Sequence, residues 1–394
     1  MLPAKGTGDV DNWTRLINYV RTNPDSSLFP ECLNYRCGVF YPATYPPGHF
    51  LIVYVLGRIA PVNINPHLLF KITVFSFYLL GLAVLLIFHP GLITAVVYLG
   101  LPSLIINSQG LGYTDVFFLP QLIGSLFLLS RNKHFPAGLL FGLACFFKWQ
   151  PVILLPLILV YLFFSQKGKN GLFKPGIFLV GMIVPQFILI WFKADPVTTL
   201  KLFLSGTLND PILSAALNLP WLVTQYLISS GRALPNQAGV YFLEISKNNP
   251  FYSLMFSGRL IFLLVYTGIL IQFTRKLKNR SGFNFFLLSG QLVFFSYFMI
   301  SPAVHENHFY IPVILSLMLF LRNPNLHTII LLLMSELINF TNLSFFYGLT
   351  GIPLINVSKN PLISIILTLI FALVYFRQIR SYWRSEKIVI QPED

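Results

Sequence analysis

The stretch HLLFKITVFSFYLLGLAVLLIF, residues 67–88, carries a single charged side chain, Lys71. A helix needs roughly 20 predominantly apolar residues to cross the hydrocarbon core of a bilayer. The stretch meets that length, so it predicts a membrane-spanning helix. Further apolar runs, separated mostly by short polar breaks, follow it at residues 92–107, 115–130, 136–148, 151–165, 176–192, 256–274, 283–300, 309–321, 327–347 and 360–376.

The composition extends this prediction to the whole chain. Hydrophobic residues make up 55% of the 394 residues and charged residues 10%, whereas a soluble domain carries about 25% charged residues. So few charges cannot cover a water-facing surface. We therefore predict an all-α, polytopic transmembrane bundle of about 11 spans that forms one integrated domain at residues 67–376. Several runs are shorter than a full span, and those on either side of residues 148–151 are expected to meet at a polar point inside the bundle.

The charges alternate along the chain as they do in membrane proteins. Lys and Arg are enriched in cytoplasmic loops. Basic runs fill alternate breaks, at residues 131–134, 166–174, 275–280, 322–327 and 377–387, and most acidic residues fall in the others. This pattern predicts an external lobe at residues 1–66, a large external loop at about 193–255 and a cytoplasmic tail at 377–394. The net charge of +14 lies largely in these loops, so no nucleic-acid partner is expected.

The N-terminal lobe is predicted to contain short helices. The segment Trp13 to Val20 places four apolar side chains on one face at helical spacing. Phe50 to Leu56 is apolar but too short to span, so it is expected at the membrane interface. No apolar stretch precedes Asp9, so no cleavable signal peptide is expected.

Two acidic residues, Asp9 and Asp11, lie just before the first of these helices. A carboxylate partly desolvated at a membrane edge has a raised pKa and can accept a proton from an attacking hydroxyl. We expect the two carboxylates to influence each other and Gly8 to permit close approach of the backbone. The alternative is that Asp9 is an ordinary loop residue or the N-cap of the helix at Trp13.

A second polar cluster, His305, Glu306 and His308, lies in a break predicted to be external. Its H-E-x-H spacing lacks the i, i+4 histidines of the H-E-x-x-H zinc motif. Histidines here are suited to binding a phosphate or stabilising one as it leaves. The alternative is a polar end cap of a helix at the membrane boundary.

Two further charged residues lie within or between apolar runs. Lys148, in F-F-K-W-Q-P, either has a functional role or is a snorkelling lysine whose ammonium reaches water. Glu336, in L-L-M-S-E-L-I-N-F, lies deeper and requires a partner.

The three cysteines add little. Cys145 is expected to pack in its apolar run, and Cys32 and Cys37 either form a local external disulfide or stay free.

The chain contains no P-loop, no Rossmann glycine fingerprint and no Cys/His zinc spacing. These absences disfavour a cytoplasmic enzyme driven by ATP or a nucleotide sugar. A lipid-linked phosphate sugar would be available to an external active site.

Taken in order, three motifs resemble the GT-C superfamily of membrane glycosyltransferases. They are G-D-x-D at residues 8–11, Y-P-P at 45–47 and V-H-E at 304–306. Within that superfamily the chain is similar to the glucosyl- and mannosyltransferases that use polyprenyl- or dolichyl-phosphate sugars. Two features depart from the family: eight residues precede Asp9, where the family has a membrane helix, and Thr44 replaces an acid before Y-P-P.

The resemblance implies an inverting hexosyl transfer from the lipid phosphate to an acceptor hydroxyl, such as that of a lipid-linked glycan, outside the cytoplasm. It implies that Asp9 is the general base, that Asp11 is the acid beside it and that His305 lies near the donor phosphate. Tyr45 and Glu306 belong to the same motifs, and His308 lies two residues after V-H-E. Lys148 with Gln150 resembles a lysine–glutamine element in which Trp149 intervenes. We expect these residues to bind the donor phosphate or another part of the substrate. Members of this subgroup work without a metal, so no cofactor is expected, although a divalent metal stays open because other GT-C enzymes use one.

Two other classes of protein remain as alternatives. A transporter or flippase would explain a bundle with buried ionisable residues, although it usually shows internal symmetry. A non-catalytic membrane scaffold would leave the external acids as solvated surface. The compact length favours a prokaryotic plasma membrane, with the endoplasmic reticulum membrane as the alternative in a eukaryote.

Overall fold

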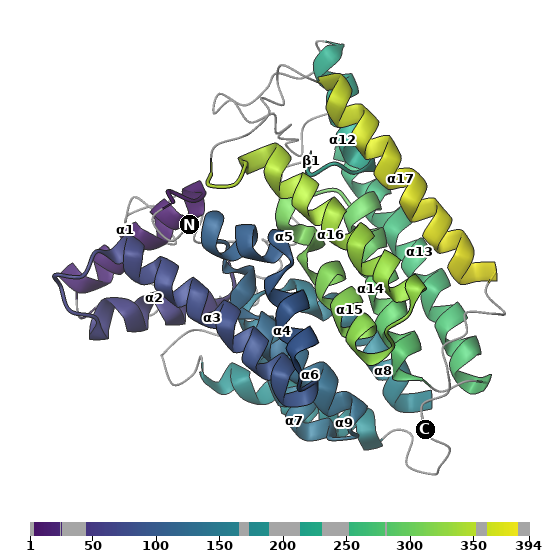
Figure 1. The fold of residues 1–394 in the computed structure, drawn as a ribbon, viewed down its shortest axis with the longest axis horizontal. Coiled ribbons are helices and arrows are strands. Elements are labelled where there is room, and N and C mark those ends of the chain that lie inside the picture. Colours follow the sequence, from purple (N-terminus) through teal and green to yellow (C-terminus); the bar gives the residue numbers. More distant parts are fainter. Residues whose placement is uncertain are drawn as a thin grey trace. The chain divides into compact units, whose positions relative to one another are not determined.

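The computed structural model describes residues 4–23, 25, 45–164, 173–188, 213–230, 252–279, 282–351 and 361–384. In these residues nearly all regular structure is helical, as the sequence predicts (Figure 1). The one pairing of strands among them is a parallel bridge between β1 (Ser214–Ala215) and β2 (Val304–His305). Cys32 and Cys37 and most of the predicted loop at 193–255 lie outside the described residues.

The chain divides into two compact units. Unit 1 comprises Met1–Val152, Leu172–Asp210 and Leu349–Gly351, and unit 2 comprises Ile153–Gly171, Pro211–Gly348 and Ile352–Asp394. The helices of unit 1 are α1 (Gly8–Thr22), α2 (Pro47–Ile59), α3 (Pro66–Phe88), α4 (Leu92–Leu99), α5 (Pro102–Ile105), η3 (Ile106–Gly110), η4 (Thr114–Phe117), α6 (Leu119–Ser130), α7 (His134–Phe147), α9 (Phe173–Ile183) and η6 (Val184–Gln186). The helices of unit 2 are α8 (Leu155–Phe164), α12 (Leu219–Ser229), α13 (Tyr252–Asn279), α14 (Phe283–Ile300), η7 (Glu306–Phe309), α15 (Tyr310–Arg322), α16 (Leu326–Tyr347) and α17 (Pro361–Arg384), and η5 (Gln150–Leu154) crosses the boundary in the chain.

Among the described residues, five helices are long and apolar enough to cross a membrane, namely α3, α13, α14, α16 and α17, and the bent pair Leu92–Leu99 and Pro102–Gly110 would make a sixth span if it crosses as one. They are compatible with an integral membrane protein. The predicted span at residues 67–88 forms α3, which begins one residue earlier. The Asn65 side chain caps this helix by accepting hydrogen bonds from the His67 and Leu68 N–H groups. Several of the other predicted runs form helices shorter than 18 residues, so the count of about 11 spans stays a prediction.

One predicted run, residues 92–107, is a broken helix. Its two parts, Leu92–Leu99 and Pro102–Gly110, meet at an angle of 64°. Gly100 ends the first part and Pro102 opens the second. Because a proline cannot donate an amide hydrogen bond and disfavours helical backbone in the residue before it, the helix ends there. The second part continues into the π-helical turn η3.

Helix α1 confirms the predicted amphipathic helix and extends it at both ends. Its buried face consists of Val10, Trp13, Leu16, Ile17 and Val20. This face packs against α2 and α3. The predicted spacing therefore identified the correct side of the helix.

The start of α1 is fixed by two backbone hydrogen bonds. Gly6 N–H donates to the Thr350 carbonyl at 3.1 Å, and Thr7 N–H donates to the Leu111 carbonyl at 3.0 Å. Gly6 and Gly351 have φ of +76° and +97°, and a Cβ on Gly351 would lie 2.0 Å from the Gly6 oxygen. The expectation of close backbone approach at Gly8 is wrong, because nothing lies within 4 Å of a Cβ there; the close approach is at Gly6.

Helices α6 and α7 form a hairpin that brings two breaks in the sequence together. The turn between them contains Asn132 with φ of 57°, and the Ser125 hydroxyl donates to the Ala137 carbonyl at 2.8 Å. Because the helices are antiparallel neighbours, the residues before α6 and after α7 lie at the same end of the hairpin. Those residues include Asp115 and Lys148.

Candidate functional site

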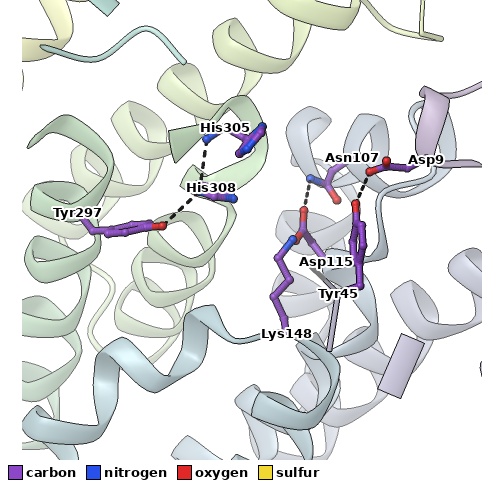
Figure 2. Close-up of polar contacts among 8 residues, drawn as sticks. All are labelled: Asp9, Tyr45, Asn107, Asp115, Lys148, Tyr297, His305 and His308. Carbon is purple, nitrogen blue, oxygen red and sulfur yellow. Dashed lines mark hydrogen bonds and ion pairs between the residues drawn. The ribbon is translucent and has the colours of Figure 1, made fainter. Parts of the chain in front are cut away.

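Asp9 lies in the first turn of α1, and the Tyr45 hydroxyl donates a hydrogen bond to its Oδ2 (Figure 2). Tyr45 precedes the two prolines that open α2. The positive end of the α1 dipole stabilises a carboxylate in this position. The reading of Asp9 as an N-cap is wrong, because Thr7 is the cap residue and the helix begins at Gly8.

Asp11 lies in the same turn of α1 and is half-buried. Successive residues of an α-helix are about 100° apart, so side chains at i and i+2 project from different sides. Asp9 and Asp11 therefore do not face each other, and the expectation that the two carboxylates influence each other stays a prediction. The catalytic role expected of Asp11 stays a prediction.

Lys148 forms an ion pair with Asp115, with Nζ 2.8 Å from Oδ1 (Figure 2). The Asp115 side chain is completely buried, and the Lys148 side chain is 14% exposed. Asn107, in η3, donates from Nδ2 to the other Asp115 oxygen at 3.4 Å. The ammonium therefore lies beside a buried carboxylate, and the reading of Lys148 as a snorkelling lysine is wrong.

The His49 imidazole lies next to the Tyr45 ring and within the electrostatic influence of Lys148, so it is close to both polar contacts of unit 1. Its ring lies 5.6 Å from the Trp13 ring, 5.1 Å from the Tyr45 ring and 5.7 Å from the Phe117 ring. Burial lowers the pKa of His49 well below its usual value, and the positive charge of Lys148 lowers it further, against an opposing effect of the Pro46 carbonyl. The imidazole is consequently neutral at neutral pH.

Several buried polar atoms of unit 1 make no hydrogen bond among the described residues. They include Trp13 Nε1, Asn107 Oδ1 and both amide atoms of Gln150. Such atoms are ordinarily satisfied by protein groups or by ordered water, and each exception requires an explanation. Gln150 is 8% exposed and lies two residues after Lys148. The polar atoms left over in unit 1 are suited to a polar ligand or bound water.

The predicted cluster in unit 2 is built around His308. Its Nδ1 accepts the backbone N–H of His305 at 3.4 Å and lies 3.5 Å from the Tyr297 hydroxyl (Figure 2). Glu306 is buried, whereas both histidines are half-buried. The contact between His305 and His308 is that of a helix end cap, at the start of η7. Across the described ranges of the chain, no group of three or more His, Cys, Asp or Glu side chains is placed to hold a metal ion.

The strand that carries His305 is held by a segment from the predicted large loop. β1 pairs with β2, and Ala303, whose φ is +60°, donates its N–H to the Leu213 carbonyl at 3.1 Å. The Asn218 side chain donates to the Phe298 carbonyl at 2.9 Å. A non-glycine residue in left-handed backbone persists only where its surroundings enforce it, so these contacts define the conformation just before His305.

Sequence reasoning missed three residues of the unit 1 cluster, Asp115, Asn107 and His49. The sequence did contain a signal for Asp115, because the charge alternation predicts that it lies on the same side of the membrane as Lys148. His49 directly precedes an apolar segment and gave no such signal.

The chain matches no protein-family model, and no curated protein sequence matches it.

Proposed function

We propose that the protein is an integral-membrane glycosyltransferase of the GT-C type with about 11 spans. In this proposal it transfers a hexose, with inversion, from a polyprenyl- or dolichyl-phosphate donor to an acceptor hydroxyl such as that of a lipid-linked glycan. The reaction takes place on the extracytoplasmic face, in a prokaryotic plasma membrane or, in a eukaryote, the endoplasmic reticulum membrane. The observation that carries the proposal is the hydrogen bond from Tyr45 to Asp9 in a turn fixed by the backbone contacts of Gly6 and Thr7.

Asp9 is the general base in this reaction. The acceptor hydroxyl gives its proton to Asp9 as its oxygen forms a bond to the anomeric carbon. The bond between that carbon and the phosphate oxygen breaks, and the lipid phosphate leaves with the electron pair. Tyr45 orients the carboxylate by donating to Oδ2. Positioned proton transfer of this kind contributes about 10²- to 10⁴-fold to the rate.

Lys148 and Gln150 bind the donor phosphate. The ammonium of Lys148 retains 14% exposure while paired with Asp115, and Gln150 has amide atoms without partners among the described residues. Asp115 positions Lys148 and is not expected to touch the substrate. The resemblance assigns His305 to the donor phosphate. Glu306 and His308 bind the donor with it in this proposal, and Asp11 has a supporting catalytic role.

The test is transfer of labelled hexose in proteoliposomes that contain the purified full chain. A synthetic polyprenyl-phosphate hexose is the donor, a nucleotide hexose is the comparison donor, and extracted lipid-linked glycan is the acceptor. We expect transfer from the lipid donor alone, and loss on the order of 100-fold or more in Asp9→Asn. Asp25→Asn is the matched control, because Asp25 is an exposed acid of the same predicted lobe. Equal rates for wild type and Asp9→Asn would refute the assignment of the base.

A transporter or flippase is the second candidate, and one feature of unit 2 favours it. Polar side chains link α14, α15, α16 and α17 inside the unit: Ser316 contacts Ser335 at 3.0 Å, Gln291 donates to Ser335 at 3.4 Å, and Gln378 donates to Gln291. Buried polar residues within spans often mark a substrate path. Label that crosses the proteoliposome membrane without joining the acceptor would support this candidate and contradict the transferase.

A further inference from the structure

Four helix ends meet at one end of unit 2. The Phe285 ring, near the start of α14, stacks on Tyr382 near the end of α17 at 5.6 Å and on Phe273 of α13 at 5.6 Å. Arg322, the last residue of α15, donates to the Asn284 side chain at 3.0 Å. Helices α13 and α17 run alongside each other here (Figure 1), and Lys276 donates to the Tyr382 carbonyl at 2.9 Å.

This end of unit 2 is strongly basic. It carries Arg275, Lys276, Arg322, Arg377, Arg380 and Arg384. The described part of unit 2 contains two acidic residues, Glu306 and Glu336. Glu306 follows the opposite end of α14, and Glu336 lies ten residues into α16, about 15 Å along its axis from Leu326. Neither acid is therefore placed to neutralise the basic end.

Among the described residues, the observed interactions account for part of this charge. Lys276 lies over the rings of Phe285 and Tyr382, at 5.4 Å and 5.1 Å. Arg384 is in the last turn of α17, where the helix dipole stabilises a cation. Arg377 is seven residues earlier, about 10 Å along the axis, beyond the reach of that effect. Arg275, Arg377 and Arg380 are exposed, and within the described part of unit 2 no acidic side chain is placed to balance them.

The cations begin where an exposed apolar face ends. Leu369, Leu373 and Phe376 of α17 are exposed, and Arg377 follows directly. Trp383 is 43% exposed and packs beside Gly268 of α13, where an added Cβ would lie 3.2 Å from its ring. Tryptophan is enriched at the boundary between hydrocarbon and headgroups. Along α17 the exposed apolar face is followed by Arg377 and Arg380 and then by Trp383 and Arg384, so an apolar surface borders a cationic one, as the acyl chains of a lipid border its headgroup.

We propose that this end of unit 2 is a binding site for an anionic glycerophospholipid. Arg377 and Arg380 contact the headgroup phosphate, Arg275 and Arg384 extend the positive surface, and the acyl chains lie along the exposed apolar face of α17. The inference does not depend on the proposed transferase activity. A zwitterionic lipid fits less well, because its own cation would face the arginines.

The test compares lipids bound to the purified full chain by native mass spectrometry. Phosphatidylglycerol and phosphatidylcholine are supplied at equal concentration, with glycerol phosphate as a soluble competitor. Each basic residue near an anionic surface contributes about 1 kcal/mol, or roughly fivefold. We therefore expect the triple variant Arg377→Gln, Arg380→Gln, Arg384→Gln to bind phosphatidylglycerol on the order of 100-fold more weakly. The matched control removes the same number of positive charges from unit 1, through Lys5→Gln, Arg15→Gln and Arg58→Gln, and should still bind phosphatidylglycerol.

A second variant tests whether a loss of lipid binding in the first comes from misfolding or from the removed charges. Replacement of the same three arginines by lysine preserves the charge and should preserve the preference for phosphatidylglycerol. Equal retention of the two lipids by wild type would overturn the proposal. So would equal losses in the two glutamine variants, or displacement of phosphatidylglycerol by glycerol phosphate at the same concentration.

Discussion

The two units hold their polar side chains in different ways. In unit 1 a completely buried carboxylate, Asp115, is paired with the Lys148 ammonium at 2.8 Å. In unit 2 the hydrogen bonds of His308 to the His305 N–H and the Tyr297 hydroxyl are 3.4 Å and 3.5 Å long, beyond the usual range. The ion pair fixes opposite charges in one geometry, whereas such long hydrogen bonds hold the imidazole less tightly. The Lys148–Asp115 contact is therefore the more tightly fixed of the two.

The largest effect is expected from breaking the ion pair of unit 1. Lys148→Met leaves the Asp115 carboxylate buried without its cation, and removing one partner of a buried pair costs about 3–5 kcal/mol. We expect the free energy of unfolding, measured by chemical denaturation in micelles, to fall by that amount. Lys148→Arg should lose much less.

The double variant Asp115→Leu, Lys148→Met sharpens this prediction. Replacing a buried pair by apolar side chains is often neutral, so the double variant should recover most of the lost stability. If Lys148→Met proved as stable as wild type, the pair would not be the rigid centre of unit 1.

The next effect concerns the backbone that places Asp9. Gly351→Ala would put a Cβ 2.0 Å from the Gly6 oxygen in left-handed backbone, and overpacking of this kind costs about 1–3 kcal/mol. Gly8→Ala is the control, because a Cβ there has open space. Thermal unfolding of the two variants should differ clearly, and equal midpoints would show that the start of α1 adapts freely.

A pH dependence is expected from His49. Its pKa in the folded protein is lowered, so below about pH 6.5 the unfolded state takes up a proton that the folded state does not. The contribution of His49 to stability should therefore be constant above neutral pH. It should fall by up to about 1.4 kcal/mol per pH unit as the pH drops from about 6.5 to the lower pKa of the folded state. His49→Phe should reduce this slope, and His327→Gln in unit 2 should leave it. An unchanged slope in His49→Phe would contradict the neutral imidazole.

The smallest effect is expected in unit 2. Tyr297→Phe removes a contact of 3.5 Å to His308, and a hydrogen bond so long contributes little, at most about 0.5 kcal/mol. The unfolding midpoint should stay close to that of wild type. A loss comparable to that of Lys148→Met would show that unit 2 depends on its polar contacts as strongly as unit 1.

Sequence patterning predicted the helices well where the signal is local. Residues 67–88 form α3, and the spacing from Trp13 to Val20 gives the buried face of α1. The count of spans was not predictable in the same way. Breaks such as that at Gly100 and Pro102 bend an apolar run without interrupting its hydrophobicity.

The candidate site was only partly predictable because its contacts are tertiary. Asp115 and Lys148 are far apart in sequence and meet because α6 and α7 form a hairpin. His49 became part of the cluster through packing against Trp13. The motif residues Asp9 and Tyr45, by contrast, were identified from sequence and lie in direct contact.

The most direct test of the central claim compares Asp9→Asn with Asp11→Asn in the same transfer assay. Both variants remove one negative charge from the first turn of α1, so they share any effect on the helix dipole. The account predicts that Asp9→Asn loses on the order of 100-fold or more in transfer from the polyprenyl-phosphate donor, while Asp11→Asn loses much less. Equal losses, or a larger loss in Asp11→Asn, would contradict it.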